Sequence, residues 1–344
     1  MTPIMKNKIF YWLLSAVLIL LSFLYLSYLT ANNPLDSEEN NIEIKFTNLL
    51  PTTLINKKPD LLSLHKDYPD VTPYLLEFCY GIPLTSDSSY LQELKKFIAQ
   101  DYVLKTEREL KKRFTDLNHH KTRIKGAFGR LKFHFKDFKT PEEVIFSNTN
   151  YNYNATCYNE SVLVGLERYI GGNHPVIIEA LNPSDFPEWI RNGMEEEFMD
   201  RDVVSAWIST LLIKETTGFH IEEMIRWGKI HVITEMGLRI DNKDIAPEEI
   251  LRWSNIQYKW ALSNESKFWK YLMDENLLFD SNEKNRAYLI NNGPYTIGLP
   301  KESPDRMGQF LGYQMVRNYI LTENIELSEL PSIGYKKILQ SYTP

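Results

Sequence analysis

An apolar run near the N-terminus places the strongest constraint on this 344-residue chain. Residues 9–29 contain no charged side chain, and a helix of about 20 apolar residues spans the hydrocarbon core of a bilayer. Lys6 and Lys8 precede the run, whereas the first acidic residue after it is Asp36. The positive-inside bias therefore predicts a cytoplasmic N-terminus at residues 1–8, one transmembrane helix at 9–29, and a body outside the cytoplasm.

A cleavable signal peptide is the alternative explanation of this segment. The run is long for the hydrophobic region of a signal peptide, and Leu29 occupies a position where cleavage before residue 32 would favour a small side chain. Both features favour an uncleaved anchor. No cysteine occurs before Cys79, so a lipid cannot be attached to a cysteine directly after the run. The polar composition of residues 30–45 predicts a tether, and residues 46–344 are left as the extracytoplasmic domain.

Hydrophobic periodicity in the body predicts a mainly α fold with a small β element, which is the α+β class. Two short β-type runs, 144–146 and 162–166, flank a loop rich in asparagine and predict a hairpin. The region from residue 67 onward contains no Pro/Gly/Ser-rich linker and no repeat, so we expect one domain. Helical spacing is found within 67–145 and at 203–213, 221–236, 247–262, 268–272 and 307–320.

Charge and cysteine content exclude several classes of protein. The net charge of −6 and the lack of a long basic run argue against nucleic-acid binding. Cys79 and Cys157 are too few for a disulfide framework, although a single bridge and two small buried residues both remain open. The acidic cluster of Glu195, Glu196, Glu197, Asp200 and Asp202 is interpreted as a solvated helix face, with a cation site as the alternative.

Motifs that carry known catalytic chemistry are missing from the sequence. None of the seven histidines forms the i, i+4 pair, with a glutamate between, that a helical zinc site requires. The sequence also lacks the nucleophile elbow, the phosphate-binding loop and the dinucleotide-binding turn. We therefore expect no metal, no cofactor and no enzymatic activity.

The segment 303–319 predicts a closely packed helix that carries two arginines. Gly308 and Gly312 are four residues apart, so they lie on one side of the helix and allow another helix to approach. Arg306 and Arg317 are eleven residues apart and are expected to project from similar sides. They are candidates for holding a carboxylate or another anion. An internal salt bridge, for example to Glu223, is the structural alternative.

From about residue 66 to residue 344 the chain resembles the GldB family, the gliding-motility lipoproteins of Bacteroidota. Several segments in order carry this resemblance, and the stretch that begins at residue 303 is the most specific. These segments are Leu131–Phe135 with Pro141, Val164–Gly171, Glu223–Lys229, Ser303–Gly308, Gly312–Tyr319 and the ending Ser341–Pro344.

The family is similar to predicted zinc-dependent peptidases whose helix carries H-E-x-x-H, and the corresponding stretch here is Glu222-Glu223-Met224-Ile225-Arg226. Arg226 is permanently charged and cannot bind zinc, and a lone carboxylate such as Glu222 is a poor zinc site. The resemblance thus implies a degenerate zincin-like helical domain. Its candidate degenerate-site or binding residues are Glu222, Glu223, Arg226, Lys229, Arg306 and Arg317.

The resemblance also implies a function: a non-catalytic component of the gliding motility and type IX secretion apparatus. Such a protein would be a single-pass protein of the inner membrane with its body in the periplasm, and its partners would be other gliding or secretion proteins and the cytoplasmic membrane. Two alternatives stay open. One is a membrane-anchored metallopeptidase-like hydrolase that uses Glu223, and the other is a periplasmic module whose aromatic side chains bind a ligand or peptidoglycan.

Overall fold

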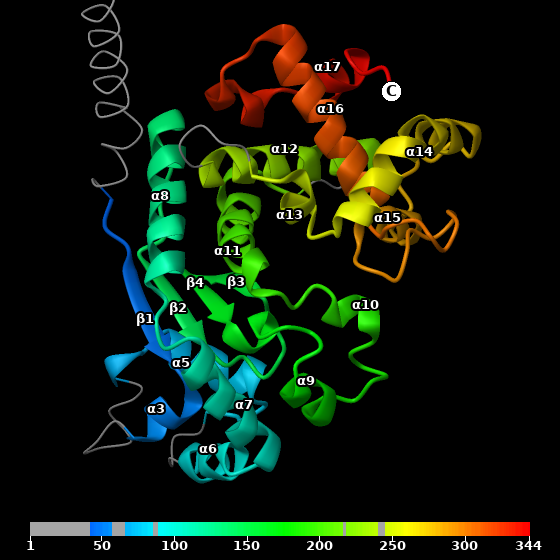
Figure 1. The fold of residues 1–344 in the computed structure, drawn as a ribbon. Helices are drawn as coiled ribbons and strands as arrows, with labels where there is room; N and C mark the ends of the chain where they lie inside the picture. Colours follow the sequence, from blue (N-terminus) through cyan, green and yellow to red (C-terminus); the bar gives the residue numbers. More distant parts are fainter. Residues whose placement is uncertain (1–41, 57–65, 85–88, 216–217, 240–244) are drawn as a thin grey trace, which may run out of the picture.

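The computed structural model describes residues 42–56, 66–84, 89–215, 218–239 and 245–344 (Figure 1). The predicted membrane helix at 9–29 and most of the predicted tether lie outside these residues. Within the described ranges, no helix combines the length and hydrophobicity needed to cross a membrane. Ile42 is already buried, and the first strand begins at Lys45, the last residue of the predicted tether.

Helices make up most of the body and surround one small sheet, so the predicted α+β class is confirmed. The strands are β1 (Lys45–Leu49), β2 (Glu143–Ser147), β3 (Ala155–Tyr158) and β4 (Ser161–Gly165). The α-helices of the first half are α3 (Pro51–Asn56), α5 (Val71–Tyr74), α6 (Tyr90–Ile98), α7 (Asp101–Arg113), α8 (Asn118–His134), α9 (Pro175–Ala180) and α10 (Glu188–Arg191). Those of the second half are α11 (Met199–Trp207), α12 (His220–Leu238), α13 (Pro247–Leu251), α14 (Asn255–Asp274), α15 (Glu283–Ile290), α16 (Met307–Glu323) and α17 (Tyr335–Gln340).

The sheet has the order β1-β2-β4-β3, and this order corrects the predicted hairpin. The two runs expected to pair as a hairpin are β2 and β4, which are parallel neighbours with Val144 opposite Val162. β4 instead forms its hairpin with β3, a short strand inside the predicted loop. β1 adds a second parallel pair to β2, so β2 is central and its apolar side chains are covered on both faces.

Alternation along the strands divides the core between the two faces of the sheet. Val144 and Phe146 contact one cluster, formed mainly with α8, α11, α12 and α16. Ile145 points to the other face, where α3, α5, α6 and the start of α7 pack. Figure 1 shows α6 and α7 below the sheet and α8 and α11 above it. The larger cluster extends into the C-terminal half of the chain.

The helices α12 and α16 cross at glycines, as predicted for Gly312 (Figure 1). Gly308 instead faces Leu289 and Ile290 of α15, so the two glycines contact different helices. A Cβ atom added to Gly312 would lie 1.7 Å from the carbonyl oxygen of Met224, and one added to Gly228 would lie 2.1 Å from the carbonyl oxygen of Gly312. Only glycine allows backbones to approach this closely. The contact between the two helices therefore depends on a glycine from each.

The predicted helix at 247–262 is divided in the structure. α13 ends at Leu251, and Arg252 adopts a left-handed conformation with φ of +54°. α14 then begins with a capping box between Ser254 and Gln257. Because left-handed arginine has no sequence signature, the continuous apolar pattern concealed the break. The break brings Arg252 and Trp253 beside the cleft described next.

Candidate functional site

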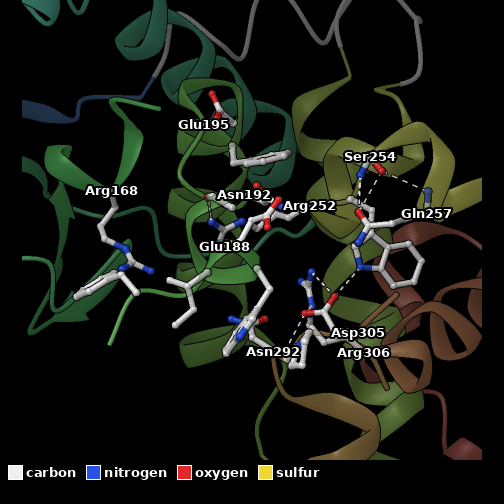
Figure 2. Close-up of a pocket in the computed structure, with 18 of the residues that line it drawn as sticks. Arg168, Glu188, Asn192, Glu195, Arg252, Ser254, Gln257, Asn292, Asp305 and Arg306 are labelled. Carbon is white, nitrogen blue, oxygen red and sulfur yellow. Dashed lines mark hydrogen bonds and ion pairs between the residues drawn. The ribbon is translucent and has the colours of Figure 1, made fainter. Parts of the chain in front are cut away.

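A cleft of about 840 Å³ lies among the loop that carries α10, the turn between α13 and α14, and the loop before α16 (Figure 2). Its polar side chains include three arginines: Arg168 from beyond β4, Arg252, and Arg306. Its aromatic side chains are Phe186, Trp189, Phe198 and Trp253. Mixed apolar and charged walls of this kind are typical of binding sites.

Arg306 is held in the cleft wall by the residue before it. Its Nε and Nη2 donate to the two carboxylate oxygens of Asp305 at 2.9 and 3.1 Å. The Asp305 carboxylate also accepts from Nε1 of Trp253 at 2.9 Å and from the amide of Gly293 at 3.2 Å. Arg306 has a φ of +54°, a conformation that costs a non-glycine residue about 1 kcal/mol or more. These bonds compensate for that cost, and the charges of Asp305 and Arg306 neutralise each other.

Arg252 is the second left-handed arginine, and it connects the cleft to the core. Its Nη1 lies 3.3 Å from Oδ2 of Asp202, its Nη2 donates to the carbonyl of Gly193, and its guanidinium lies 5.4 Å from the ring centre of Phe198. The Nε of Arg252 is buried without a hydrogen-bond partner among the described residues. Arg252 therefore joins Asp202, behind the cleft, to the backbone of the facing loop.

Asp202 is the centre of a buried polar network on α11. Its Oδ2 accepts from the hydroxyl of Tyr169 at 2.8 Å, and its Oδ1 accepts from Nη1 of Arg201 at 3.0 Å. Burial, and next the charge of Asp202, raise the pKa of Tyr169 far above its usual range, so the phenol keeps its proton and donates. Burial lowers the pKa of Arg201 to about 10, which leaves Arg201 charged at neutral pH.

The network continues from Arg201 to α16. Nη2 of Arg201 lies 3.2 Å from Nδ1 of His231, and Nε2 of His231 lies 2.9 Å from Oε1 of Gln309. Burial and the charge of Arg201 hold the pKa of His231 well below its usual range, so the imidazole is neutral. Because arginine can only donate, Nδ1 accepts and Nε2 carries the proton. Gln309 then donates to the carbonyl of Ile290 at 2.7 Å, which completes the chain.

The interpretation of the acidic cluster as a solvated helix face is wrong for Asp200 and Asp202, which are 1% and 5% exposed. Asp200 accepts from Nδ1 of His120 at 2.8 Å and from Arg123 at 3.4 Å. Both aspartates are buried because cations from distant parts of the sequence pair with them. Glu197, in contrast, is exposed as expected.

The four sequence-predicted residues on α12 do not line the cleft. Glu222 is half-buried in the first turn of α12. Glu223 accepts from Nη1 of Arg226 at 3.0 Å, and Arg226 also donates to the carbonyls of Lys214 and Ser209 at 2.9 and 3.3 Å. These bonds tie α12 to the chain that follows α11.

Lys229 fastens the last part of the chain to α12. Its Nζ donates to the carbonyls of Pro331 and Ile333 at 3.2 and 2.5 Å. The side chain is buried, and burial lowers the pKa of Lys229 to about 8. Lys229 therefore has a structural role in the described residues.

The lowered pKa of Lys229 predicts a rise in stability with pH. Between pH 8 and the ordinary lysine value of about 10.4, the unfolded chain binds more protons than the folded chain, so the free energy of unfolding increases with pH. The slope from this one group approaches about 1.4 kcal/mol per pH unit. Because other groups also titrate in this range, the effect of Lys229 is the difference between two proteins: from pH 8 to 9.5 we expect chemical denaturation to give a more positive slope for the native chain than for Lys229→Met. Parallel pH profiles for the two proteins would contradict the assignment.

Arg306 and Arg317 bind different acids. Nη1 of Arg317 donates to the hydroxyl of Tyr313 at 3.1 Å, and its Nη2 lies 3.9 Å from Glu235. The internal salt bridge suggested for these arginines therefore forms, but with Asp305 and Glu235 and not with Glu223. Of the six sequence-predicted residues, Arg306 alone lines the cleft.

The cysteines and possible metal ligands are also placed by the structure. Cys79 is buried and Cys157 is partly buried, and both are free thiols. Across the ranges that the structure describes, no three or more His, Cys, Asp or Glu side chains are grouped so as to hold a metal ion.

Comparison with known proteins defines the family. The sequence model of a family described as gliding motility protein GldB matches residues 30–344, nearly the whole chain. The chain belongs to the GldB family. The match confirms the resemblance carried by the segments after residue 66 and extends it through the predicted tether. No curated protein and no solved structure matches the chain.

Membership of the GldB family supports a role related to gliding motility and, because the family is one of lipoproteins, an association with a membrane. The network behind the cleft of this GldB family member was missed by sequence reasoning. One signal was available: Asp200, Arg201 and Asp202 are flanked by Phe198 and Met199 on one side and by Val203 and Val204 on the other. Charges inside an apolar helix indicate buried ion pairs rather than a solvated face.

Proposed function

We propose that this GldB family member is a non-catalytic component of the gliding motility and type IX secretion apparatus that binds a protein partner through its cleft. In this proposal the body lies in the periplasm, and the segment at residues 9–29 anchors it in the inner membrane. The family match supports the association with motility. The mode of action rests on the chemistry of α12 and of the cleft.

The observation that carries the non-catalytic proposal is the state of the segment that corresponds to H-E-x-x-H. The only glutamate with the expected catalytic position, Glu223, is paired with Arg226, and neither residue lines the cleft. A general base must reach the proton that it removes. The ion pair and the two backbone carbonyls bound by Arg226 instead give this segment a structural role. A degenerate zincin-like origin of the fold is part of the same proposal.

The cleft supports binding because it combines aromatic surface with oriented charges. Trp189 and Phe186 are partly exposed on the loop around α10, where a partner can reach them. Trp253 is fixed by its bond to Asp305. Aromatic and arginine side chains are the residues that contribute most binding energy in protein interfaces.

Filling the cleft tests this proposal. Asn192 is exposed at the cleft, so Asn192→Trp is expected to abolish spreading on agar in cells whose own copy is deleted, with the protein still present in the membrane. Lys336→Trp adds the same side chain to exposed α17, outside the cleft, and should leave spreading unchanged. A photo-crosslinker at residue 192 should capture a gliding or secretion protein, and one at residue 336 should not. Normal spreading of Asn192→Trp would overturn binding through the cleft.

The hydrolase alternative is tested on the purified full-length protein. Elemental analysis and a general peptidase assay are expected to give no bound metal and no cleavage. One zinc per chain, with peptidase activity lost in Glu223→Gln, would overturn the non-catalytic proposal.

A periplasmic ligand- or peptidoglycan-binding module is a second candidate, favoured by the partly exposed rings of Phe186 and Trp189 in the cleft. Aromatic rings stack on sugars, and polar groups between them fix orientation. Sedimentation of the protein with purified peptidoglycan separates the two candidates. Binding that is lost in Asn192→Trp would favour the module over the protein-binding component.

A further inference from the structure

The arginines of the cleft differ in how their charge is balanced. Arg306 is paired with Asp305 and Arg252 with Asp202. Arg168 forms no ion pair with any acidic side chain of the described ranges. Its Nε donates to Oδ1 of Asn154 at 3.2 Å, and its guanidinium lies 5.6 Å from the ring centre of Phe186. Figure 2 shows the terminal nitrogens of Arg168 directed toward the cleft.

The surroundings of Arg168 hold it ready for an anion. The bond to Asn154 and the ring of Phe186 fix the plane of the guanidinium, so little side-chain entropy remains to be lost on binding. Burial, followed by the nearby charge of Arg252, lowers the pKa of Arg168, and the nearby charge of Glu167 acts in the opposite direction. A carboxylate that accepts two parallel bonds would compensate that charge.

Acidic residues that line the same cleft limit the kind of anion. Asp185, Glu188 and Glu197 line the cleft and are exposed, and none forms an ion pair with a cation of the described residues. A polyanion placed against Arg168 would be repelled by these carboxylates. A ligand that carries a basic group beside its carboxylate would be attracted both by Arg168 and by these carboxylates.

We propose that Arg168 anchors a binding site for a peptide segment that carries a carboxylate next to a basic side chain. The carboxylate pairs with Arg168, the basic side chain faces Glu188 and Asp185, and another residue of the segment packs on Trp189. This inference rests on the proposed function, because it names the chemistry of the partner segment that the cleft recognises.

Selection from a random heptapeptide library, displayed on phage and presented to the full-length protein in detergent, tests the inference. We expect enrichment of Asp or Glu next to Lys or Arg with the native protein, and loss of the acidic enrichment with Arg168→Gln. Arg108→Gln, a matched change on the exposed face of α7, should select the same peptides as the native protein. Arg168→Lys keeps the charge but not the two parallel bonds, so it should bind the selected peptides with intermediate affinity.

A selected peptide then provides a sharper measurement. Replacing its acidic residue by the amide should weaken binding to the native protein about tenfold, because one charge-assisted contact is lost. Binding to Arg168→Gln should stay unchanged, because that variant already lacks the contact. An equal loss with both proteins, or selection without acidic residues, would overturn the proposal. The carboxylate that binds could also be the C-terminus of the peptide. In that case amidation of the peptide's C-terminus would abolish binding.

The outcomes separate this inference from the proposed function. Normal spreading of Asn192→Trp would overturn the proposed function, whereas acidic selection dependent on Arg168 would still stand as a property of the cleft. Failure of the selection alone would overturn the peptide chemistry and leave a role of the cleft in motility intact.

Discussion

Gly312→Ala is expected to lower the free energy of unfolding by about 3 kcal/mol, the upper part of the range for overpacking a core. The added methyl group would lie 1.7 Å from the carbonyl oxygen of Met224, and a backbone atom cannot rotate away as a side chain can. The two helices must therefore separate, and the buried side chains around the crossing lose contact. Thermal and chemical denaturation of the purified full-length protein measure the effect.

Gly334→Ala is the matched control for this substitution. A Cβ atom at Gly334 would meet nothing within 4 Å, and the residue has a negative φ that alanine readily adopts. We expect a change of about 0.5 kcal/mol or less. Equal stability of Gly312→Ala and Gly334→Ala would show that α12 and α16 do not approach as closely as described.

Removal of the Asp202 carboxylate is expected to have the second large effect. Asp202→Ala leaves Arg201, Arg252 and the hydroxyl of Tyr169 without their shared acceptor. Breaking a buried ion pair by removing one partner costs about 3–5 kcal/mol, because the remaining charge stays buried. We expect a loss in this range, measured by chemical denaturation at pH 7.

Asp274→Ala provides the comparison on the surface. Asp274 pairs with Lys270 on an exposed face of α14, where both side chains are more than half exposed, so its loss should cost about 0.5 kcal/mol or less. Asp202→Asn keeps the shape and one acceptor, and it should lie between the native protein and Asp202→Ala. A cost for Asp202→Ala no greater than that for Asp274→Ala would contradict a central role of Asp202.

Elements with a continuous local pattern could be predicted from the sequence. The periodicity at 221–236 and 307–320 predicted α12 and α16, and the two glycines of the second segment predicted close packing, which Gly312 makes with α12 and Gly308 with α15. The β-type runs at 144–146 and 162–166 located two strands. Each of these signals is contained within a few helical turns or one strand.

The pairing of these elements could not be predicted in the same way. The hairpin partner of β4 is the short strand at 155–158, and the asparagine-rich sequence around this strand predicts a loop. The left-handed Arg252 breaks a pattern that looks continuous. Asp200 and Asp202 are buried because His120, Tyr169 and Arg252 reach them from other parts of the chain. Partners that are distant in sequence leave no local signal, so the cleft could be found only in three dimensions.

The topology also determines when the body can finish folding. Leu49 at the end of β1 bonds to Ser147 at the end of β2, 98 residues later, and α12 gains α16 and the carbonyls of Pro331 and Ile333 only from the end of the chain. Contacts between distant residues form slowly, and incomplete bodies expose apolar surface. While a ribosome or a translocation channel still holds the last residues, these contacts with α12 cannot form, and the body cannot complete its fold. For a protein proposed to act in the periplasm, this delay favours passage through the membrane before the body becomes rigid.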